Sequence, residues 1–161
     1  MNGLEVTVGI GGAAGDGNAA TGDTLAKVCA RLGLHVFVYN SYQSIIRGGH
    51  VWLRMRIADE KVECHGDHLS LMMALNQDTL NQHTSEVNAN GGILYNSDKL
   101  QVAQDDLQPG VVLYPFPVKD LSETFGRNPI MQNTVLLGGL LWLLDLDFDV
   151  LEGMLRETFR R

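Results

Sequence analysis

The segment GIGGAAGDG, from Gly9 to Gly17, lies between a short apolar run, Val6 to Val8, and a run with helical spacing, Asn18 to Leu32. Five glycines in nine residues allow a tight turn and the close approach of a ligand or of another backbone. A strand, a glycine turn and a helix in this order form a βα unit. The N–H groups at the start of its helix can hold an anion. The segment therefore predicts an α/β fold and raises the question of whether it binds a nucleotide or only packs.

Comparison with known phosphate-binding loops gives a partial match. Gly9, Gly11 and Ala14 fit the dinucleotide pattern G-x-G-x-x-G/A. That pattern also needs an acidic residue at the end of the second strand, and the sequence there, Tyr39 to Tyr42, has none. The spacing of a P-loop is present as well, but Asp23 stands where the lysine belongs, and its carboxylate would repel a phosphate. The residues favour packing or contact with a partner chain, and a bound phosphate stays open.

Composition limits the class of protein. A chain of 161 residues with 45% apolar residues suits one domain with a real core. The net charge of -7 argues against nucleic acid and membrane surfaces as partners. The two cysteines lie in unrelated segments, which is typical of reduced thiols, and residues 1–8 show no secretory signal. The longest apolar run, Val135 to Leu144, is too short to span a bilayer. We therefore expect a cytoplasmic protein with no membrane and no nucleic-acid partner.

Hydrophobic periodicity predicts the order of the elements. A first strand, the helix up to Leu32 and a strand at 35–39 predict a parallel pair with a right-handed crossover. Residues 50–57 alternate as a half-exposed strand and are expected to form a hairpin with a return strand at 62–64. The remaining elements are a buried strand at 69–75, a helix from 78 to about 84, short strands at 93–95 and 111–114, and helices at 131–144 and 148–159. The sequence thus predicts a single α/β domain over residues 1–161. Its architecture is a three-layer α/β/α sandwich with a mixed, largely parallel sheet and one β-hairpin.

The loop after the second strand contains the other candidate site. Ser41-Tyr42 and Arg47-Gly48-Gly49-His50 bracket it, and a loop in this place lies at the carboxyl edge of the sheet, where ligands bind in open α/β folds. The guanidinium of Arg47 suits a carboxylate or phosphate, although a local ion pair explains it equally well. The candidate cofactor-binding or interface residues are Gly11, Gly12, Gly15, Gly17, Ser41, Tyr42, Arg47, Gly48, Gly49 and His50.

Other patterns predict little chemistry in this chain. Cys64, His65 and His68 lack the second ligand pair of a zinc site, so no metal is expected. His35 and His83 have no nearby residue to pair with in the sequence. No nucleophile elbow is present, and an iron–sulfur cluster would need four thiolates. The helix at 131–144 is apolar almost all round and contains Gly138-Gly139, which favours burial by a partner subunit. The sequence therefore predicts no catalytic residue.

An ordered set of motifs resembles one known family. The set is the glycine pattern after the first strand, Thr21-Gly22-Asp23-Thr24-Leu25-Ala26, Ser41-Tyr42, Ile46-Arg47-Gly48-Gly49-His50, Asn96-Ser97-Asp98 and Asn133-Thr134-Val135-Leu136-Leu137-Gly138. Over residues 5–160 it resembles the gamma-type domain of the 2-oxoacid:ferredoxin (acceptor) oxidoreductases. The Arg-Gly-Gly-His form is most similar to domains fused at the N-terminus of an alpha subunit, as in 2-oxoglutarate-type and branched-chain-type enzymes. Asp16 departs from the family, which usually has Gln there.

The resemblance implies a role within a larger complex. The family oxidatively decarboxylates a 2-oxoacid with coenzyme A, giving an acyl-CoA, carbon dioxide and reduced ferredoxin. It implies thiamine diphosphate, Mg and iron–sulfur clusters on alpha and beta partner subunits or domains. This chain would then be inactive alone, and would help assembly and contact coenzyme A. The alternative is a free-standing nucleotide- or CoA-binding module with a degenerate Rossmann-like loop.

Overall fold

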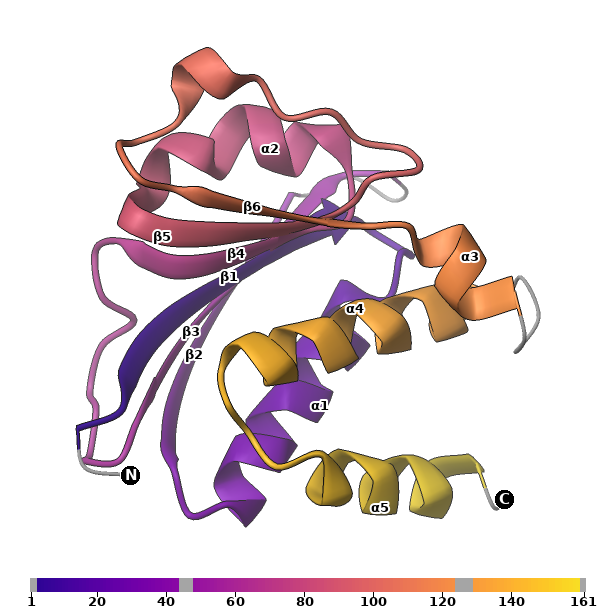
Figure 1. Cartoon of the computed structure of the whole chain (residues 1–161). Helices are drawn as coiled ribbons and strands as arrows, with labels where there is room; N and C mark the ends of the chain where they lie inside the picture. The colour runs from indigo at the N-terminus through magenta and orange to yellow at the C-terminus, as the bar shows by residue number, and fades with distance from the viewer. Residues whose placement is uncertain (1–2, 44–47, 124–128, 160–161) are drawn as a thin grey trace.

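The computed structural model describes residues 3–43, 48–123 and 129–159. Figure 1 shows a central sheet with helices on both faces. The strands are β1 (Glu5–Ala13), β2 (His35–Tyr42), β3 (His50–Ala58), β4 (Leu69–Ala74), β5 (Val87–Asn96) and β6 (Val112–Phe116). The helices are α1 (Asn18–Arg31), α2 (Gln77–His83), α3 (Val118–Ser122), α4 (Pro129–Leu143) and α5 (Phe148–Phe159), with short 3-10 turns η1 (Thr84–Glu86) and η2 (Gln104–Asp106). The predicted three-layer α/β/α class is confirmed.

The sheet is mixed, with strand order β2-β3-β1-β4-β5-β6. β3 is antiparallel to both of its neighbours, and the other pairings are parallel. The predicted adjacent parallel pair of β1 and β2 is therefore wrong in one respect. The two strands run in the same direction, but β3 lies between them and pairs with both along its length. The alternation in β3 predicts a strand, but not that it would fill this position.

The hairpin is also placed differently from the prediction. Residues 62–64 form no strand, because both edges of β3 are already occupied by β1 and β2. The segment from β3 to β4 instead passes the side chain of Arg54, whose Nη1 donates to the carbonyls of Gly66 and Asp67 at 3.0 and 3.3 Å. The antiparallel pair that follows directly in the chain is β2–β3.

One face of the sheet is covered by α1, α4 and α5 (Figure 1). The fully buried members of this core include Val8, Ile10, Leu53, Met55 and Leu140. α4 is apolar almost all round because it contacts the sheet, α1, α3 and α5 of its own chain. A Cβ at Gly139 would lie 2.5 Å from Cζ of Phe116 in β6. The close approach predicted for Gly139 is thus made within the chain, while Trp142 stays 68% exposed.

The other face has a smaller core under α2 and the segment between β5 and β6 (Figure 1). Trp52, Leu69, Met72, Leu80 and Ile93 are buried there. Asn76 caps the start of α2, and its Oδ1 accepts from the backbone N–H of Thr79 at 2.9 Å. This face also buries polar side chains, and they matter for the site.

Two features of the strands at the β6 end of the sheet, β5 and β6, differ from the prediction. The turn expected at Asn90-Gly91-Gly92 lies inside β5, because Asn90 takes a left-handed φ of 64° and the pairing with β4 shifts register between Leu69 and Leu71. β6 includes Pro115, which an edge strand tolerates because one of its sides has no neighbour to accept an N–H. Within the described ranges, every helix is too short or too polar to cross a membrane.

Candidate functional site

The carboxyl ends of β1, β2 and β4 meet the start of β3 at one edge of the sheet. The backbone N–H of Ala14 donates to the carbonyl of Gly49 at 2.8 Å, and that of Gln43 donates to the carbonyl of His50 at 3.2 Å. The N–H of His50 in turn donates to Oε1 of Gln43 at 3.0 Å. These bonds bring the glycine segment, Ser41-Tyr42 and Gly48-Gly49-His50 together at this edge, which we call the carboxyl edge. Arg47 lies outside the described residues.

The glycines of β1 are explained by close packing. A Cβ at Gly11 would lie 2.4 Å from side-chain atoms of Thr79, and one at Gly9 would lie 2.3 Å from Trp52. Gly12 faces the opposite side of the sheet, where a Cβ would come within 2.6 Å of Oδ1 of Asn18. Gly11 and Gly12 are thus strand residues packed against helices, not members of an open loop.

The turn itself contains Gly15 and Gly17, which have φ values of 100° and 85°. Only glycine adopts such angles readily, so these two positions are fixed by backbone conformation. Gly17 is also the residue before α1, and a Cβ there would lie 2.8 Å from Nδ2 of Asn133. Apart from the two chain neighbours of Gly15, no described residue has an atom within 4 Å of a Cβ built there, so this side of the turn is open among the described residues.

The carboxylate of Asp16 lies in the turn directly before α1. Its Oδ2 accepts a hydrogen bond from the backbone N–H of Ala13 at 3.0 Å, and its carbonyl accepts from Nδ2 of Asn133 at 2.5 Å. The loop thus supplies its own carboxylate to a backbone donor, and this negative charge opposes a phosphate at the start of α1. The geometry weakens the phosphate-cradle interpretation and ties the turn to α4.

A chain of hydrogen-bonded polar side chains lies behind the edge, on the α2 face. Nε2 of His50 and Nε2 of His83 are 2.9 Å apart, and Nδ1 of His83 lies 2.6 Å from Oε1 of Glu86. The other oxygen of Glu86 forms an ion pair with the guanidinium of Arg54. We call His50, His83, Glu86 and Arg54 the histidine relay. The expectation that His83 has no partner is wrong, because the η1 turn folds Glu86 back against it.

Trp52 packs against the relay without belonging to it. Its ring stacks on that of His83 with 3.7 Å between centroids and 4° between planes, which holds the imidazole flat against β3. His50 and Arg54 are 7% and 9% exposed. Burial, together with the nearby His83, lowers the pKa of His50, and Asp78 opposes that effect. Within the described part of the chain, Nδ1 of His50 is buried without a hydrogen-bond partner.

Sequence reasoning missed this relay because its members come from three elements. Only the alternation of β3, which places His50, Trp52 and Arg54 on one face, is visible as a pattern. The spacing of His83 and Glu86 predicts a contact between them only if the chain stays helical through both. Nothing in the sequence shows that α2 lies over β3.

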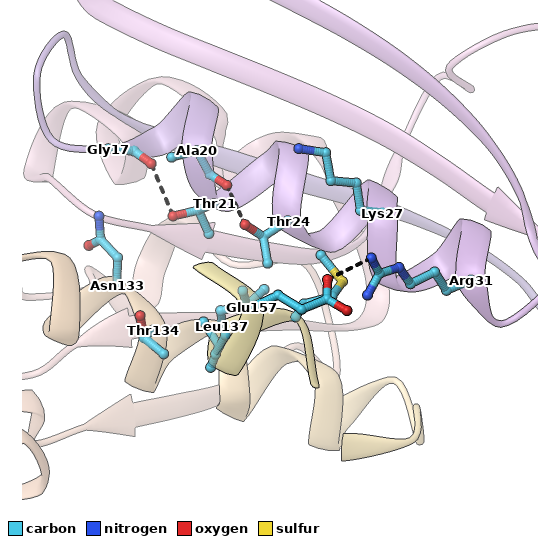
Figure 2. Close-up of a pocket in the computed structure, with 12 residues that line it drawn as sticks. Gly17, Ala20, Thr21, Thr24, Lys27, Arg31, Asn133, Thr134, Leu137 and Glu157 are labelled. Atoms are coloured by element: carbon cyan, nitrogen blue, oxygen red, sulfur yellow. Dashed lines mark hydrogen bonds and ion pairs between the residues drawn. The ribbon is translucent and has the colours of Figure 1, made fainter. Parts of the chain in front are cut away.

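A groove lies on the side of the sheet opposite α2, between α1 and the pair α4–α5. It has a volume of about 440 Å³. Figure 2 shows Thr24, Lys27 and Arg31 along α1, with Arg31 reaching across to Glu157 of α5 at 3.1 Å. Gly17 and Asn133 line the end nearest the carboxyl edge. The sequence did not predict the groove, because it depends on how α5 returns against α1.

The cysteines and remaining histidines form no metal centre among the described residues. Burial raises the pKa of the Cys29 thiol to about 12, so Cys29 is an inert core residue. Cys64 is exposed and its sulfur accepts from Nη1 of Arg56 at 3.0 Å. His65 contacts the ring of Tyr39, with 5.1 Å between centroids.

Comparison with known proteins places the chain in a family. A model of the family described as pyruvate ferredoxin/flavodoxin oxidoreductase matches residues 7–161. The ketoisovalerate oxidoreductase subunit VorA of Methanothermobacter thermautotrophicus is 30% identical over 157 residues, which are 97% of this chain and 31% of that protein. The curated relatives that the chain matches are much longer, and it spans between 12% and 32% of their lengths.

Two solved structures share the fold. The 2-oxoglutarate:ferredoxin oxidoreductase of Magnetococcus marinus, with 2-oxoglutarate, coenzyme A and succinyl-CoA bound, matches with a TM-score of 0.85 and 26% identity over 96% of this chain and 27% of that one. The gamma subunit of a keto/oxoacid ferredoxin oxidoreductase from Geobacter sulfurreducens matches with a TM-score of 0.77 and 21% identity, covering 96% of this chain and 85% of that one.

Proposed function

We propose, from the premise that this chain belongs to the pyruvate ferredoxin/flavodoxin oxidoreductase family, that residues 1–161 act as a single gamma-type domain of a cytoplasmic 2-oxoacid:ferredoxin oxidoreductase. The domain is either a separate gamma subunit or the first part of a longer alpha subunit. The observation that carries the proposal is the match of nearly the whole chain to about a third of VorA. The free-standing nucleotide-binding module has no support in these comparisons.

The residues of this chain do not fit the redox groups that the family's chemistry needs. An iron–sulfur cluster requires four thiolates, whereas this chain has two cysteines, of which Cys29 is buried and Cys64 exposed. The described residues also offer no group of acids and histidines for a metal. We therefore assign thiamine diphosphate, Mg and the clusters to alpha and beta partners, and ferredoxin contact to the assembled complex. The domain itself contributes no catalytic residue.

Its own contribution is contact with partners and with coenzyme A. The Magnetococcus enzyme, whose chain shares this fold, was solved with coenzyme A bound. In this chain the carboxyl edge offers Ser41, Gly48 and Gly49 beside Tyr42, which is 59% exposed. Gly11 and Gly12 pack against Thr79 and Asn18, and Asp16 adds a negative charge to the turn before α1. We therefore assign the coenzyme A contact to the side of the carboxyl edge formed by Ser41, Tyr42, Gly48 and Gly49, and not to the start of α1. Trp142 and Phe148, which are 68% and 45% exposed, are assigned to a partner surface.

Calorimetry separates the two functions. The full chain is titrated with coenzyme A and, separately, with NAD, and then co-expressed with a candidate thiamine diphosphate-binding partner chain from the same genome. We expect no NAD binding, weak coenzyme A binding and stable co-purification. Tight NAD binding without a partner would establish the free-standing module instead.

A further inference from the structure

The histidine relay connects the interior of the α2 face to the carboxyl edge. We propose that His83 and Glu86 are positioning residues, which fix the ring of His50 in one tautomer and so hold the start of β3, and with it the carboxyl edge, in place. Neither residue belongs to the edge itself, and the proposal deepens the proposed function by naming what orders the contact site for coenzyme A. Its first test needs no ligand.

The direction of each hydrogen bond follows from Glu86. A carboxylate only accepts, so Nδ1 of His83, 2.6 Å from Oε1, carries a proton. In neutral His83, Nε2 is then an acceptor, and Nε2 of His50 at 2.9 Å must donate to it. His50 is thereby restricted to the tautomer with its proton on Nε2. The two histidines of the pair therefore carry their protons on opposite ring nitrogens.

The far end of the relay is fixed as well. The second carboxylate oxygen of Glu86 pairs with Arg54, whose Nη1 also donates to the carbonyls of Gly66 and Asp67. The side chain of Arg54 is 11% exposed, and the ring of His83 is stacked on Trp52. Rotation of the His83 ring or of the Glu86 carboxylate would break the hydrogen bonds that each makes to its two neighbours, which favours the observed arrangement.

The other end of the relay, His50, belongs to the backbone of the carboxyl edge. His50 is the first residue of β3 and pairs in register with Ala13, the last residue of β1. Its own backbone and that of Gly49 hold Gln43 and Ala14 by hydrogen bonds. The ring of His50 is the only link in this path, among the described residues, that reaches from the edge to Glu86. Without the contact of the His50 ring to His83, the start of β3 would be held at this edge by its backbone hydrogen bonds and by the side chain of Gln43 alone.

The experiment combines imidazole nitrogen-15 NMR with amide hydrogen exchange on the full chain at pH 8. In the wild type we expect His50 protonated on Nε2 and His83 on Nδ1. In His83→Phe, which keeps an aromatic ring on Trp52, we expect the amides of Ala14 and Gln43 to exchange about tenfold faster, the change that corresponds to one net hydrogen bond. His65→Phe, a matched change outside the relay, should leave both amides unchanged. His50 protonated on Nδ1, or unchanged exchange at both amides in His83→Phe, would overturn the proposal.

Glu86→Gln covers the case in which His83→Phe fails to fold. The amide oxygen still accepts from Nδ1 of His83, so the tautomer of His50 should persist. The lost charge weakens the hold on Arg54, and the amides of Ala14 and Gln43 should exchange about two- to threefold faster than in the wild type. A titration with coenzyme A then separates the two proposals. If the wild type binds coenzyme A and His83→Phe binds it more weakly, both stand. If the wild type does not bind, the coenzyme A contact fails while the tautomer and exchange results still decide the relay.

Discussion

The two faces of the sheet are stabilised by different means. The face under α1, α4 and α5 is mainly apolar, around Ile10, Leu53 and Leu140, and its buried polar side chains include Asn18 and Thr21 at the start of α1. The face under α2 buries His50, Arg54 and Thr79 beside a smaller apolar core. Dispersion and burial have no direction, whereas hydrogen bonds depend on which atom donates. The first face therefore supplies most of the apolar burial, and the second face adds a set of directional contacts behind the carboxyl edge.

A cavity in the first face should have the largest effect on stability. Leu140→Ala removes a fully buried side chain, and Leu→Ala changes in a core cost about 2–5 kcal/mol. Urea unfolding should show that loss in the free energy of unfolding. Because the cavity is remote from the relay, the exchange of Ala14 and Gln43 by local opening should match the wild type. Local opening at these amides without a loss of global stability would contradict the division between the faces.

A matched pair of glycines tests close packing on the same face. A Cβ at Gly22 in α1 would lie 2.2 Å from Cδ1 of Leu53, whereas one at Gly153 in α5 meets nothing within 4 Å. We expect Gly22→Ala to destabilise by about 1–3 kcal/mol from overpacking. Gly153→Ala should be neutral or stabilise by up to about 1 kcal/mol, since Ala favours helix. Thermal unfolding of both variants decides this, and equal effects would show that α1 does not approach β3 so closely.

The second face should show the smaller, pH-dependent effect. Burial and His83 lower the pKa of His50 in the folded chain, against the pull of Asp78, while in the unfolded chain it stays near its ordinary value of about 6.5. Below that pH the unfolded chain binds the extra proton, so stability should fall as pH drops toward the folded pKa and be unaffected by this group above about 6.5. Urea titrations at several pH values check it. His50→Gln should flatten the slope, and the same change at exposed His35 should not.

The difference between the faces also explains what the sequence could predict. Apolar periodicity located α1, α4, α5 and the buried strand β4, because one face of each element must meet the core whatever the topology. The pairing of β3 between β1 and β2 was missed, since alternation identifies a strand and not its neighbours. The turn after β1, Ser41-Tyr42 and Gly49-His50 lie close together, because the ends of parallel strands share one edge. The role of these residues in ligand or partner contact stays a prediction, and Arg47 lies outside the described residues.

The relay lay beyond sequence reasoning for a physical reason. His83 and Glu86 lie 33 and 36 residues after His50 in the sequence. Their contact with His50 depends on the placement of α2 over β3. Gly9 and Gly11 also depend on residues that are distant in the sequence. Their pattern predicted a turn or a ligand contact, but side chains of Trp52 and Thr79 from other elements fill the space they leave.

The most direct test of the central claim is to purify the tagged chain from the cells that make it and to measure thiamine diphosphate content and 2-oxoacid- and coenzyme A-dependent dye reduction in the product. The account predicts that both co-purify with the chain, and that both disappear when the folded chain is separated from its partners. A folded chain that carries neither from the start, or one that keeps the activity after separation, would contradict the assignment as a non-catalytic gamma-type domain.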